Sequence, residues 1–238
     1  MFRTLREDIR TVFSKDPAAR NMLDVLLFYP GLHAIWTHRL ANFLWQHKLR
    51  FPARLLSHIN RFLTGIEIHP GAEIGRRCFI DHGAGVVIGA TSEIGDDVLL
   101  YQGVVLGGTT LEKGKRHPTL GNNVEMGTGS VALGDISIGD GARIGSGSVV
   151  IRSVPPGTTV VGIPGRAVSD SQQPIMDLEH GRLPDPIAEA IRLVLKEQDK
   201  LTERLKKLEA SSGIIAPEDE MTERMREIER EFSQGEGI

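Results

Sequence analysis

The chain has 238 residues, enough for one large domain or two modest ones whose core needs no disulfide. Its formal net charge of −3 at pH 7 argues against a nucleic-acid partner and against a basic membrane-binding surface. The single cysteine, Cys78, excludes an intramolecular disulfide, and no segment approaches the about 20 apolar residues of a membrane span. We therefore expect a cytoplasmic protein that acts on small molecules.

The N-terminal quarter of the chain has the apolar spacing of helices. Apolar residues recur at three- and four-residue steps over 2–13, which predicts a first helix. Asp16 followed by Pro17 reads as the N-cap and first turn of a second helix. A third helix is expected after the Pro-Gly pair at 30–31, and a fourth from Pro52.

After Gly65 the apolar period changes to six. A helix cannot use this period, but a short strand followed by a glycine-containing corner can. Three such units make a triangular coil of about 18 residues, so the repeat predicts a solenoid of roughly four coils with a continuous core. The expected inward residues are Ile68, Ile74, Ile80, Ile88, Ile94, Leu100, Leu106, Leu120, Met126, Ala132, Ile138, Ile144 and Val150.

The repeat is irregular at two places. It slips by two residues after Ile80, and it is interrupted between Leu106 and Leu120 by GGTTLEKGKRHPT. Fourteen residues separate these two core positions, where we expect twelve to keep the register. A loop must leave the coil there, and loops on a rigid scaffold commonly carry function.

The C-terminal part contains a charged segment with apolar residues at alternating steps of four and three. This is a heptad pattern, which favours a self-associating coiled coil over a lone amphipathic helix. A glutamine inside the seam would specify the register at some cost in stability. The seam consists of Ile187, Ile191, Val194, Gln198, Leu201, Leu205 and Leu208.

The residues that could carry chemistry cluster at the irregular places. Glu67 and His82 are fifteen positions apart, close to one coil, so stacking could bring them together. A carboxylate that accepts a hydrogen bond from one imidazole nitrogen leaves the other as a general base. Asp81 adjoins His82, and Arg116 with His117 offers donors for a carboxylate. Each of these residues could instead be a solvated corner or loop residue.

The combination of motifs is more specific than any single residue. The chain contains DPAAR, GIEIHPGAEIG, FIDHGAGVVIG, an LGGT loop ending in GKRHP, and VPPGTTVVGIPGR. From about Leu5 to Val168 it resembles the serine O-acetyltransferases of bacterial cysteine biosynthesis. The resemblance implies a left-handed parallel β-helix and a homotrimer with active sites between neighbouring subunits. It also implies transfer of the acetyl group of acetyl-CoA to the hydroxyl of L-serine, which yields O-acetyl-L-serine and CoA.

The same resemblance assigns roles to individual residues. His82 matches the general base, and Glu67 matches the carboxylate that orients it, a position often occupied by aspartate. Asp16 and Asp81 match residues that hold the amino group of serine, and Arg116 and His117 match those that hold its carboxylate. No metal is expected.

Binding of acetyl-CoA is expected along the later coils. The family pattern places it beside Gly108, Thr109, Thr128, Arg143, Gly145 and Ser146. Ala90 stands where the family often has glutamate, so any role of that glutamate is lost here.

We expect three parts in the chain: an α-helical domain over 1–64, a β-helix acetyltransferase domain over 65–168, and a C-terminal part over 169–238 with a heptad helix at about 186–210. Because the chain begins late relative to long family members, a hexamer is in doubt. The resemblance implies feedback inhibition by L-cysteine and binding of cysteine synthase (O-acetylserine sulfhydrylase) through the C-terminal Ile238.

Two other functions share this solenoid. One is an acetyltransferase with a different acceptor, against which the zwitterion-like set of acidic and basic residues argues. The other is a carbonic anhydrase-like protein in which His69, His82 and His117 meet between subunits and bind zinc. Two observations argue against it: Glu67 is placed to orient His82, and the RHP loop suits a carboxylate better than a metal.

Overall fold

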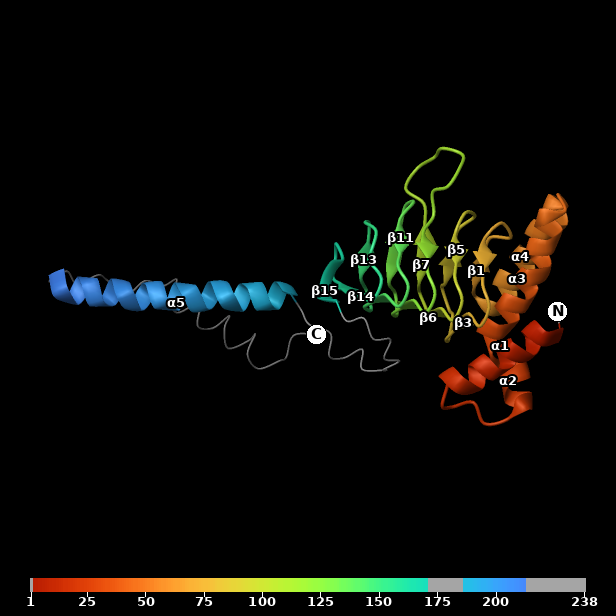
Figure 1. Ribbon diagram of the computed structural model, residues 1–238, viewed down its shortest axis with the longest axis horizontal. Coiled ribbons are helices and arrows are strands. Elements are labelled where there is room, and N and C mark those ends of the chain that lie inside the picture. Colours follow the sequence, from red (N-terminus) through yellow and green to blue (C-terminus); the bar gives the residue numbers. More distant parts are fainter. Residues whose placement is uncertain (1, 171–185, 213–238) are drawn as a thin grey trace. The chain divides into compact units, whose positions relative to one another are not determined.

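The computed structural model describes residues 2–170 and 186–212 (Figure 1). The chain divides into two compact units, Met1–Pro186 and Ile187–Ile238, and each is described by itself. The described part of the first unit holds four helices followed by stacked short strands, and that of the second holds one long helix.

Four helices open the first unit. The helix α3 begins at Pro30, where a missing backbone N–H removes no helical hydrogen bond. The helix α4 ends at Gly65, whose φ of +71° is the left-handed cap that glycine adopts without strain. The helices predicted after residues 30–31 and near Pro52 are thus confirmed. The bounds are α1 Phe2–Lys15, α2 Met22–Phe28, α3 Pro30–Gln46 and α4 Arg50–Thr64.

The prediction that Asp16 and Pro17 begin the second helix is wrong. Helix α2 begins at Met22, and its N-cap is Asn21, whose side-chain oxygen accepts the N–H of Asp24 at 2.9 Å. Asp16 instead accepts the N–H of Ala18 at 2.7 Å. An aspartate that bonds two residues ahead forms a tight turn rather than a helix cap.

Beyond Gly65 the chain forms short strands that stack into three faces, as Figure 1 shows. Face A has the order β1-β4-β7-β10-β13, face B β2-β5-β8-β11, and face C β3-β6-β9-β12-β14-β15. All pairs are parallel except β14 with β15. The strands are β1 Glu67–Ile68, β2 Glu73–Ile74, β3 Phe79–Ile80, β4 Val87–Ile88, β5 Glu93–Ile94, β6 Leu99–Leu100, β7 Val105–Gly107, β8 Thr119–Leu120, β9 Glu125–Met126, β10 Val131–Leu133, β11 Ser137–Ile138, β12 Arg143–Ile144, β13 Val149–Val150, β14 Thr158–Val161 and β15 Arg166–Asp170.

Successive strands visit faces A, B and C in turn, so this region is a parallel β-helix of triangular section, as the six-residue period predicts. We name its three edges by the faces they join. The chain passes from face A to face B at the A–B edge, then turns at the B–C edge, and starts the next coil at the C–A edge.

The core follows the predicted six-residue pattern. Every predicted inward residue is buried except Ile74, which is partly buried and packs against the same core. A second inward position, which the sequence analysis did not identify, lies two residues before each of these. It holds mostly small or β-branched residues, among them Ile66, Ala72, Val86 and Val98. Two side chains per unit therefore fill the triangular interior, which suits the close packing of protein cores.

The two irregular places add residues without breaking the stack. Glu67 pairs with Val87, 20 positions on, and Val87 pairs with Val105, 18 positions on. Val105 pairs with Val131, 26 positions on. Relative to a coil of 18, the turn after β3 adds two residues and the loop between β7 and β8 adds eight. The expected spacing of twelve was wrong, because β8 is the strand directly after β7 and six positions would have kept the register.

The N-terminal helices pack on the first coils. Val12 of α1 and Val25 of α2 form a buried cluster with Phe79 and Leu99, which point outward from face C. The start of α3 lies directly on the end of β3, since a Cβ atom on Gly31 would be 2.0 Å from the carbonyl oxygen of Ile80. This packing fixes the segment between α1 and α3 beside the turn that follows β3.

The B–C edge is closed by a ladder of side-chain oxygens. The N–H of Arg76 donates to Asp96 Oδ1 at 2.7 Å, and the N–H of Asp96 donates to Asn122 Oδ1 at 2.8 Å. The N–H of Asn122 in turn donates to Asp140 Oδ1 at 2.6 Å. Each corner is thus tied to the corner of the next coil.

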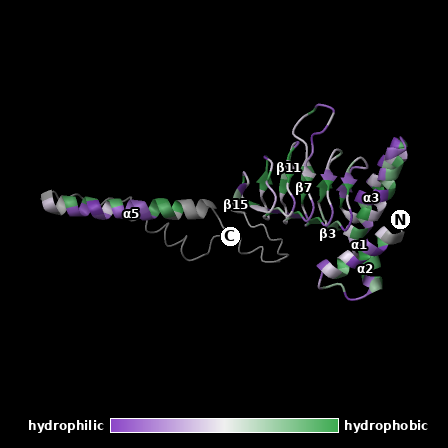
Figure 2. Cartoon of the chain, viewed as in Figure 1, coloured by the Kyte–Doolittle hydropathy of each residue, from purple (hydrophilic) through white to green (hydrophobic). Residues whose placement is uncertain are grey.

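The helix of the second unit, α5, spans Pro186–Ser212 and covers the predicted heptad segment. Apolar and polar residues alternate along it (Figure 2). At 27 residues it is about 40 Å long. The five apolar seam residues whose exposure is described, Ile191, Val194, Leu201, Leu205 and Leu208, are 44% to 66% exposed. No helix in the described ranges is long and apolar enough to cross a membrane.

We predict that Asn122→Ala destabilises the β-helix, because it leaves the N–H of Asp96 without its acceptor. A lost hydrogen bond of this kind costs about 1 kcal/mol, or about 2–4 °C in Tm for a protein of this size. Thermal unfolding followed by circular dichroism measures the change. Asp135→Ala, at an exposed position outside the ladder, is the control, and equal Tm values for the two variants would contradict the role of the ladder.

Two histidines lie where α3 meets the first coil, His38 buried and His69 partly buried. The ring of His38 donates to the backbone of Ala72, and burial lowers its pKa to about 4. His69 packs edge-on against Trp45, and burial likewise lowers its pKa to about 4. Both rings bind a proton less readily in the folded chain than in the unfolded one. Their contribution to stability is therefore complete above about pH 6.5 and is lost as the pH falls towards 4.

We predict that His38→Gln flattens the loss of stability between pH 6.5 and pH 4, whatever its effect at neutral pH. One such histidine contributes up to about 1.4 kcal/mol per pH unit in this window. Burial raises the pKa of Asp8, so Asp8 stabilises the folded chain as the pH falls, opposite to His38. This effect is the same in wild type and variant. The difference between their slopes of stability against pH therefore reports on His38. Urea unfolding at several pH values measures it, with the exposed His58→Gln as control. An unchanged slope in the His38 variant would refute the assignment.

Candidate active site

The two added residues of the first coil make a tight turn that carries Asp81 and His82. The N–H of Asp81 extends the backbone pairing of β3 with β6 and donates to the carbonyl of Leu100 at 2.9 Å. His82 has a φ of +57° and Gly83 a φ of +81°. The left-handed conformation is uncommon for a residue with a side chain and costs roughly 1–3 kcal/mol. This backbone conformation places the imidazole of His82 outside the coil, and the side chain is 72% exposed.

Asp16 and Asp81 form an acidic group beside this imidazole. His82 Nε2 lies 3.8 Å from Asp81 Oδ2. Burial raises the pKa of the Asp81 carboxyl; the charge of His82 opposes this rise, and the nearby Asp16 carboxylate adds to it. The Oδ2 atom of Asp16 accepts the hydroxyl of Tyr29 at 2.5 Å. Two carboxylates held close together create a place that favours a cation.

Glu67, the expected orienting residue, begins β1 at the same C–A edge. Its Oε2 atom lies 3.2 Å from Nε of Arg61, near the end of α4. Both side chains of this pair are largely exposed, and exposed ion pairs contribute little free energy. The carboxylate is therefore free to exchange Arg61 for another donor.

The loop between β7 and β8 carries Arg116 and His117 at the A–B edge and is attached to the coil by Thr91. The Thr91 hydroxyl oxygen accepts the backbone N–H groups of Arg116 at 3.1 Å and His117 at 3.2 Å. The imidazole of His117 fits against Gly89, where a Cβ atom would lie 1.9 Å from its Cδ2. The hydroxyl of Thr91 and the absence of a side chain at Gly89 thus position the end of the loop.

The hydrogen bonds of His117 determine its tautomer. The N–H of Thr91 donates to His117 Nδ1 at 3.3 Å, so Nδ1 is an acceptor and the ring proton lies on Nε2. Burial lowers the pKa of His117, and the charges of Arg116 and Lys115 lower it further. At neutral pH the ring is a neutral donor beside a guanidinium. This pair suits a carboxylate ligand.

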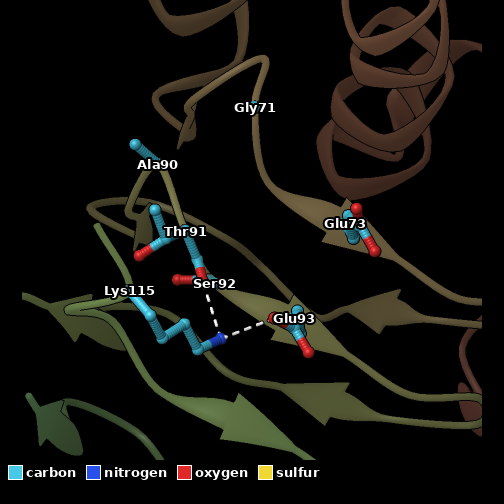
Figure 3. A pocket seen from close by; sticks show the side chains of 7 residues that line it. All are labelled: Gly71, Glu73, Ala90, Thr91, Ser92, Glu93 and Lys115. Atoms are coloured by element: carbon cyan, nitrogen blue, oxygen red, sulfur yellow. Dashed lines mark hydrogen bonds and ion pairs between the residues drawn. The ribbon is translucent and has the colours of Figure 1, made fainter. Parts of the chain in front are cut away.

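Lys115 fastens the same loop from the other side. Its Nζ donates to the carbonyl of Thr91 at 2.8 Å and to Glu93 Oε1 at 2.9 Å, as Figure 3 shows. The lysine borders a hollow of about 270 Å³ lined by Gly71, Glu73, Ala90, Thr91, Ser92, Glu93 and Lys115. Ala90, the departure from the family pattern, therefore lines a space rather than filling it.

The residues expected to bind acetyl-CoA lie at two edges and on one face. Thr128 and Ser146 are exposed at successive corners of the C–A edge, where the N–H of Gly147 donates to the carbonyl of Thr128 at 2.8 Å. Gly145 is buried at the end of β12 next to Ser146. Arg143 lies on face C with its Nε atom 3.4 Å from Glu125 Oε2. Gly108 and Thr109 are exposed at the base of the loop, at the A–B edge.

The structure therefore sorts the expected residues into two groups. The C–A edge brings together Asp16, Asp81 and His82, with Glu67 at the first strand and Thr128 and Ser146 further along. The A–B edge brings together Arg116 and His117 with Gly108 and Thr109. The two edges bound opposite sides of face A, so one chain presents two half-sites.

Sequence reasoning missed three residues that shape these half-sites. Tyr29 holds Asp16, Thr91 attaches the loop, and Gly89 makes room for His117. Gly89 and Thr91 belong to the hexad IGATSE, which had been read only as a repeat unit. Tyr29 stood in an apolar run and gave no signal of its own.

The histidines proposed as an alternative zinc site occupy different edges. His69 lies at the A–B edge, where its Nδ1 atom accepts the N–H of Gly71 at 2.9 Å. His82 lies at the C–A edge. Over residues 2–170 and 186–212, no three His, Cys, Asp or Glu side chains are arranged to hold one metal ion.

Comparison with known sequences identifies relatives of the chain. The family described as "Serine acetyltransferase, N-terminal" matches residues 1–37. The serine acetyltransferase of Bacillus pumilus is 55% identical over 208 residues, which cover 87% of this chain and 96% of the relative. That of Synechococcus elongatus is 51% identical over 244 aligned positions, which cover the whole of both chains.

Solved structures of the same kind are also similar to this chain. Neisseria gonorrhoeae serine acetyltransferase in complex with serine has a TM-score of 0.68 at 36% identity, over 71% of this chain and 69% of that one. The Brucella abortus enzyme in complex with coenzyme A has a TM-score of 0.69 at 39% identity, over 71% and 68%. A serine acetyltransferase in complex with cysteine has a TM-score of 0.70 at 39% identity, over 71% and 66%.

The motifs, the helix-capped β-helix and full-length relatives at about half identity lead to one assignment. The chain belongs to the serine acetyltransferase family.

Proposed function

We propose that Asp16, Asp81 and His82 of one copy, with Arg116 and His117 of a neighbouring copy, bind L-serine and catalyse its acetylation. The reaction transfers the acetyl group of acetyl-CoA to the serine hydroxyl and releases O-acetyl-L-serine and CoA. One observation carries the assignment of residues: an exposed imidazole lies 3.8 Å from the Asp81 carboxylate, whose pKa the nearby Asp16 carboxylate raises. This arrangement can hold an ammonium group and place the neighbouring hydroxyl beside a base.

In this mechanism His82 acts as the general base. It accepts the proton of the serine hydroxyl as the oxygen attacks the acetyl carbon, and it returns this proton to the sulfur that leaves as CoA. Glu67 takes the role of orienting His82, which requires its carboxylate to exchange Arg61 for the imidazole. The Nε2–H of His117 and the guanidinium of Arg116 donate to the serine carboxylate.

Acetyl-CoA supplies an activated acyl carbon when it is bound. We assign it to the C–A edge beside Thr128, Gly145 and Ser146 of one copy and to Gly108 and Thr109 of its neighbour. The C–A edge has room for this ligand, because a Cβ atom on Gly129 or Gly147 would meet no described atom within 4 Å. Exposed backbone at such an edge suits a thin amide chain. Arg143 is the weakest member of this set, since it already pairs with Glu125 on face C.

The arrangement of copies follows from the outward residues of the three faces. Face B presents Glu73, Glu93, Thr119 and Ser137, and the helices cover the start of face C. Face A presents a column of half-buried valines at 87, 105, 131 and 149. Three copies with face A towards a common axis would bury this column. The C–A edge of each copy would then meet the A–B edge of the next and complete three sites.

The remaining finer features belong to the same proposal. We assign left-handed winding to the coils, in line with the hexapeptide motifs, and functional domain limits of 1–64, 65–168 and 169–238. We also propose that the exposed seam of α5 pairs with α5 of the other copies as a coiled coil, because isolated helices of this kind are marginal in water. L-cysteine, which carries the same ammonium and carboxylate as serine, would inhibit by occupying the serine half-sites.

Ile238 lies outside the described residues. We propose, from the resemblance of the Gly-Ile terminus to that of the family, that it inserts into cysteine synthase.

We predict that mixed trimers of His82→Ala and His117→Ala chains regain activity. Each variant alone should lose at least about 100-fold in CoA release with serine. In a mixed trimer, one of the three sites combines the intact His82 of one chain with the intact His117 of its neighbour. Random mixing in equal amounts should therefore restore about a quarter of the wild-type rate. A mixture no more active than its parts would contradict sites shared between copies, and wild-type activity with homoserine but not serine would contradict the acceptor.

We predict that a chain ending at Ser171 forms a weaker trimer with a lower Tm, because it lacks the α5 seam. Analytical ultracentrifugation over a range of concentrations measures the association. A chain lacking only Ile238 is the matched control: it should remain trimeric and lose co-purification with cysteine synthase. A trimer of unchanged Tm in the shorter chain would refute the coiled coil, and co-purification without Ile238 would refute the contact of the terminus.

A further inference from the structure

We infer that Tyr29 is a positioning residue for the amino-acid acceptor: its hydroxyl fixes the Asp16 carboxylate so that Asp16 and Asp81 together receive the ammonium group. The inference rests on the proposed function of Asp16. Tyr29 lies in the helical region and outside the recognised motifs, and the inference adds it to the residues that determine serine binding.

The backbone of Tyr29 is held by the two helices that it joins. The residue is the C-cap of α2 and the N-cap of α3, with extended φ and ψ of −103° and 91°. Its carbonyl accepts the N–H groups of Leu32 at 3.1 Å and His33 at 3.3 Å. The direction in which the side chain leaves the backbone is therefore set by the start of α3.

The ring is fixed by packing. Tyr29 packs against the buried cluster that contains Val12, Val25, Leu32 and Phe79. Phe79 belongs to β3, which ends one residue before Asp81. The same cluster thus holds the tyrosine ring and the strand that leads into the catalytic turn.

The hydroxyl completes the fixation of Asp16. It donates to Oδ2 at 2.5 Å, while the N–H of Ala18 donates to Oδ1 at 2.7 Å. With both oxygens held, the carboxylate has one orientation. Hydrogen bonds to an ionised acceptor are the stronger kind and favour the charged form.

The charges around the hydroxyl explain why a phenol stands here. Asp16, Asp24 and Asp81 all contribute to raising the pKa of Tyr29, after the larger effect of burial. The phenol therefore keeps its proton and remains a donor throughout the working pH range. It holds the Asp16 side chain without adding a positive charge that would compete with the substrate.

Tyr29→Phe keeps the ring and removes only the donor. We expect the KM for serine to rise about tenfold, with kcat and the KM for acetyl-CoA within about twofold of wild type. The Ki of 3-hydroxypropionate, a competitor without an amino group, should stay unchanged.

Trp36→Phe is the matched control. The indole Nε1 of Trp36 donates to Asp8 Oδ2 at 3.1 Å, and Trp36 packs against the same cluster, so this variant also loses an aromatic donor to a carboxylate. It should lower Tm and leave the KM for serine unchanged.

The outcomes separate the two proposals. If wild type acetylates serine and Tyr29→Phe has an unchanged KM for serine, the positioning role is wrong while the proposed function stands. A rise in the Ki of 3-hydroxypropionate equal to the rise in the KM for serine also overturns it, because the loss would not concern the amino group. Absence of serine acetylation by wild type overturns the proposed function itself.

Discussion

Parallel pairing between successive coils is the constraint on which the structure depends. Each short strand must meet the strand one coil earlier, and each strand must place an apolar residue inside the triangle. A residue that does not fit this spacing can leave only outward, at an edge, because pairing resumes on both sides of it. The turn with His82 and the loop with His117 are such expelled segments. Hydrogen bonds of Asp81 with Leu100, and of Arg116 and His117 with Thr91, tie these segments to the coils that they interrupt.

The two expelled segments differ in charge, and the difference matches the two ends of an amino acid. The C–A edge holds Asp16 and Asp81, whose mutual repulsion is relieved by an ammonium group. The A–B edge holds a guanidinium and an imidazole that burial keeps neutral and donating. Face A separates them within one chain, so under the proposed arrangement the complementary charges would act on a single ligand across a contact between copies.

Periodicity explains both the success and the failures of the predictions. The six-residue repeat is local, so the coil, its core and the slip that exposes His82 could be predicted from it. Asp16 was misplaced because Asp-Pro suits both a helix cap and an Asx turn, and only the packing of α2 decides between them. The loop was miscounted because spacing alone does not say which face follows. Tyr29 and Thr91 were missed because their partners lie 13 and 25–26 residues away.

The closed B–C edge limits how such an enzyme can diverge. Each side-chain oxygen of its ladder must meet the amide of the neighbouring coil, so an inserted residue there would break several contacts at once. The other two edges already carry insertions of two and eight residues. New acceptor specificities can therefore evolve by lengthening segments at these two edges, while the third preserves the scaffold on which they are tried.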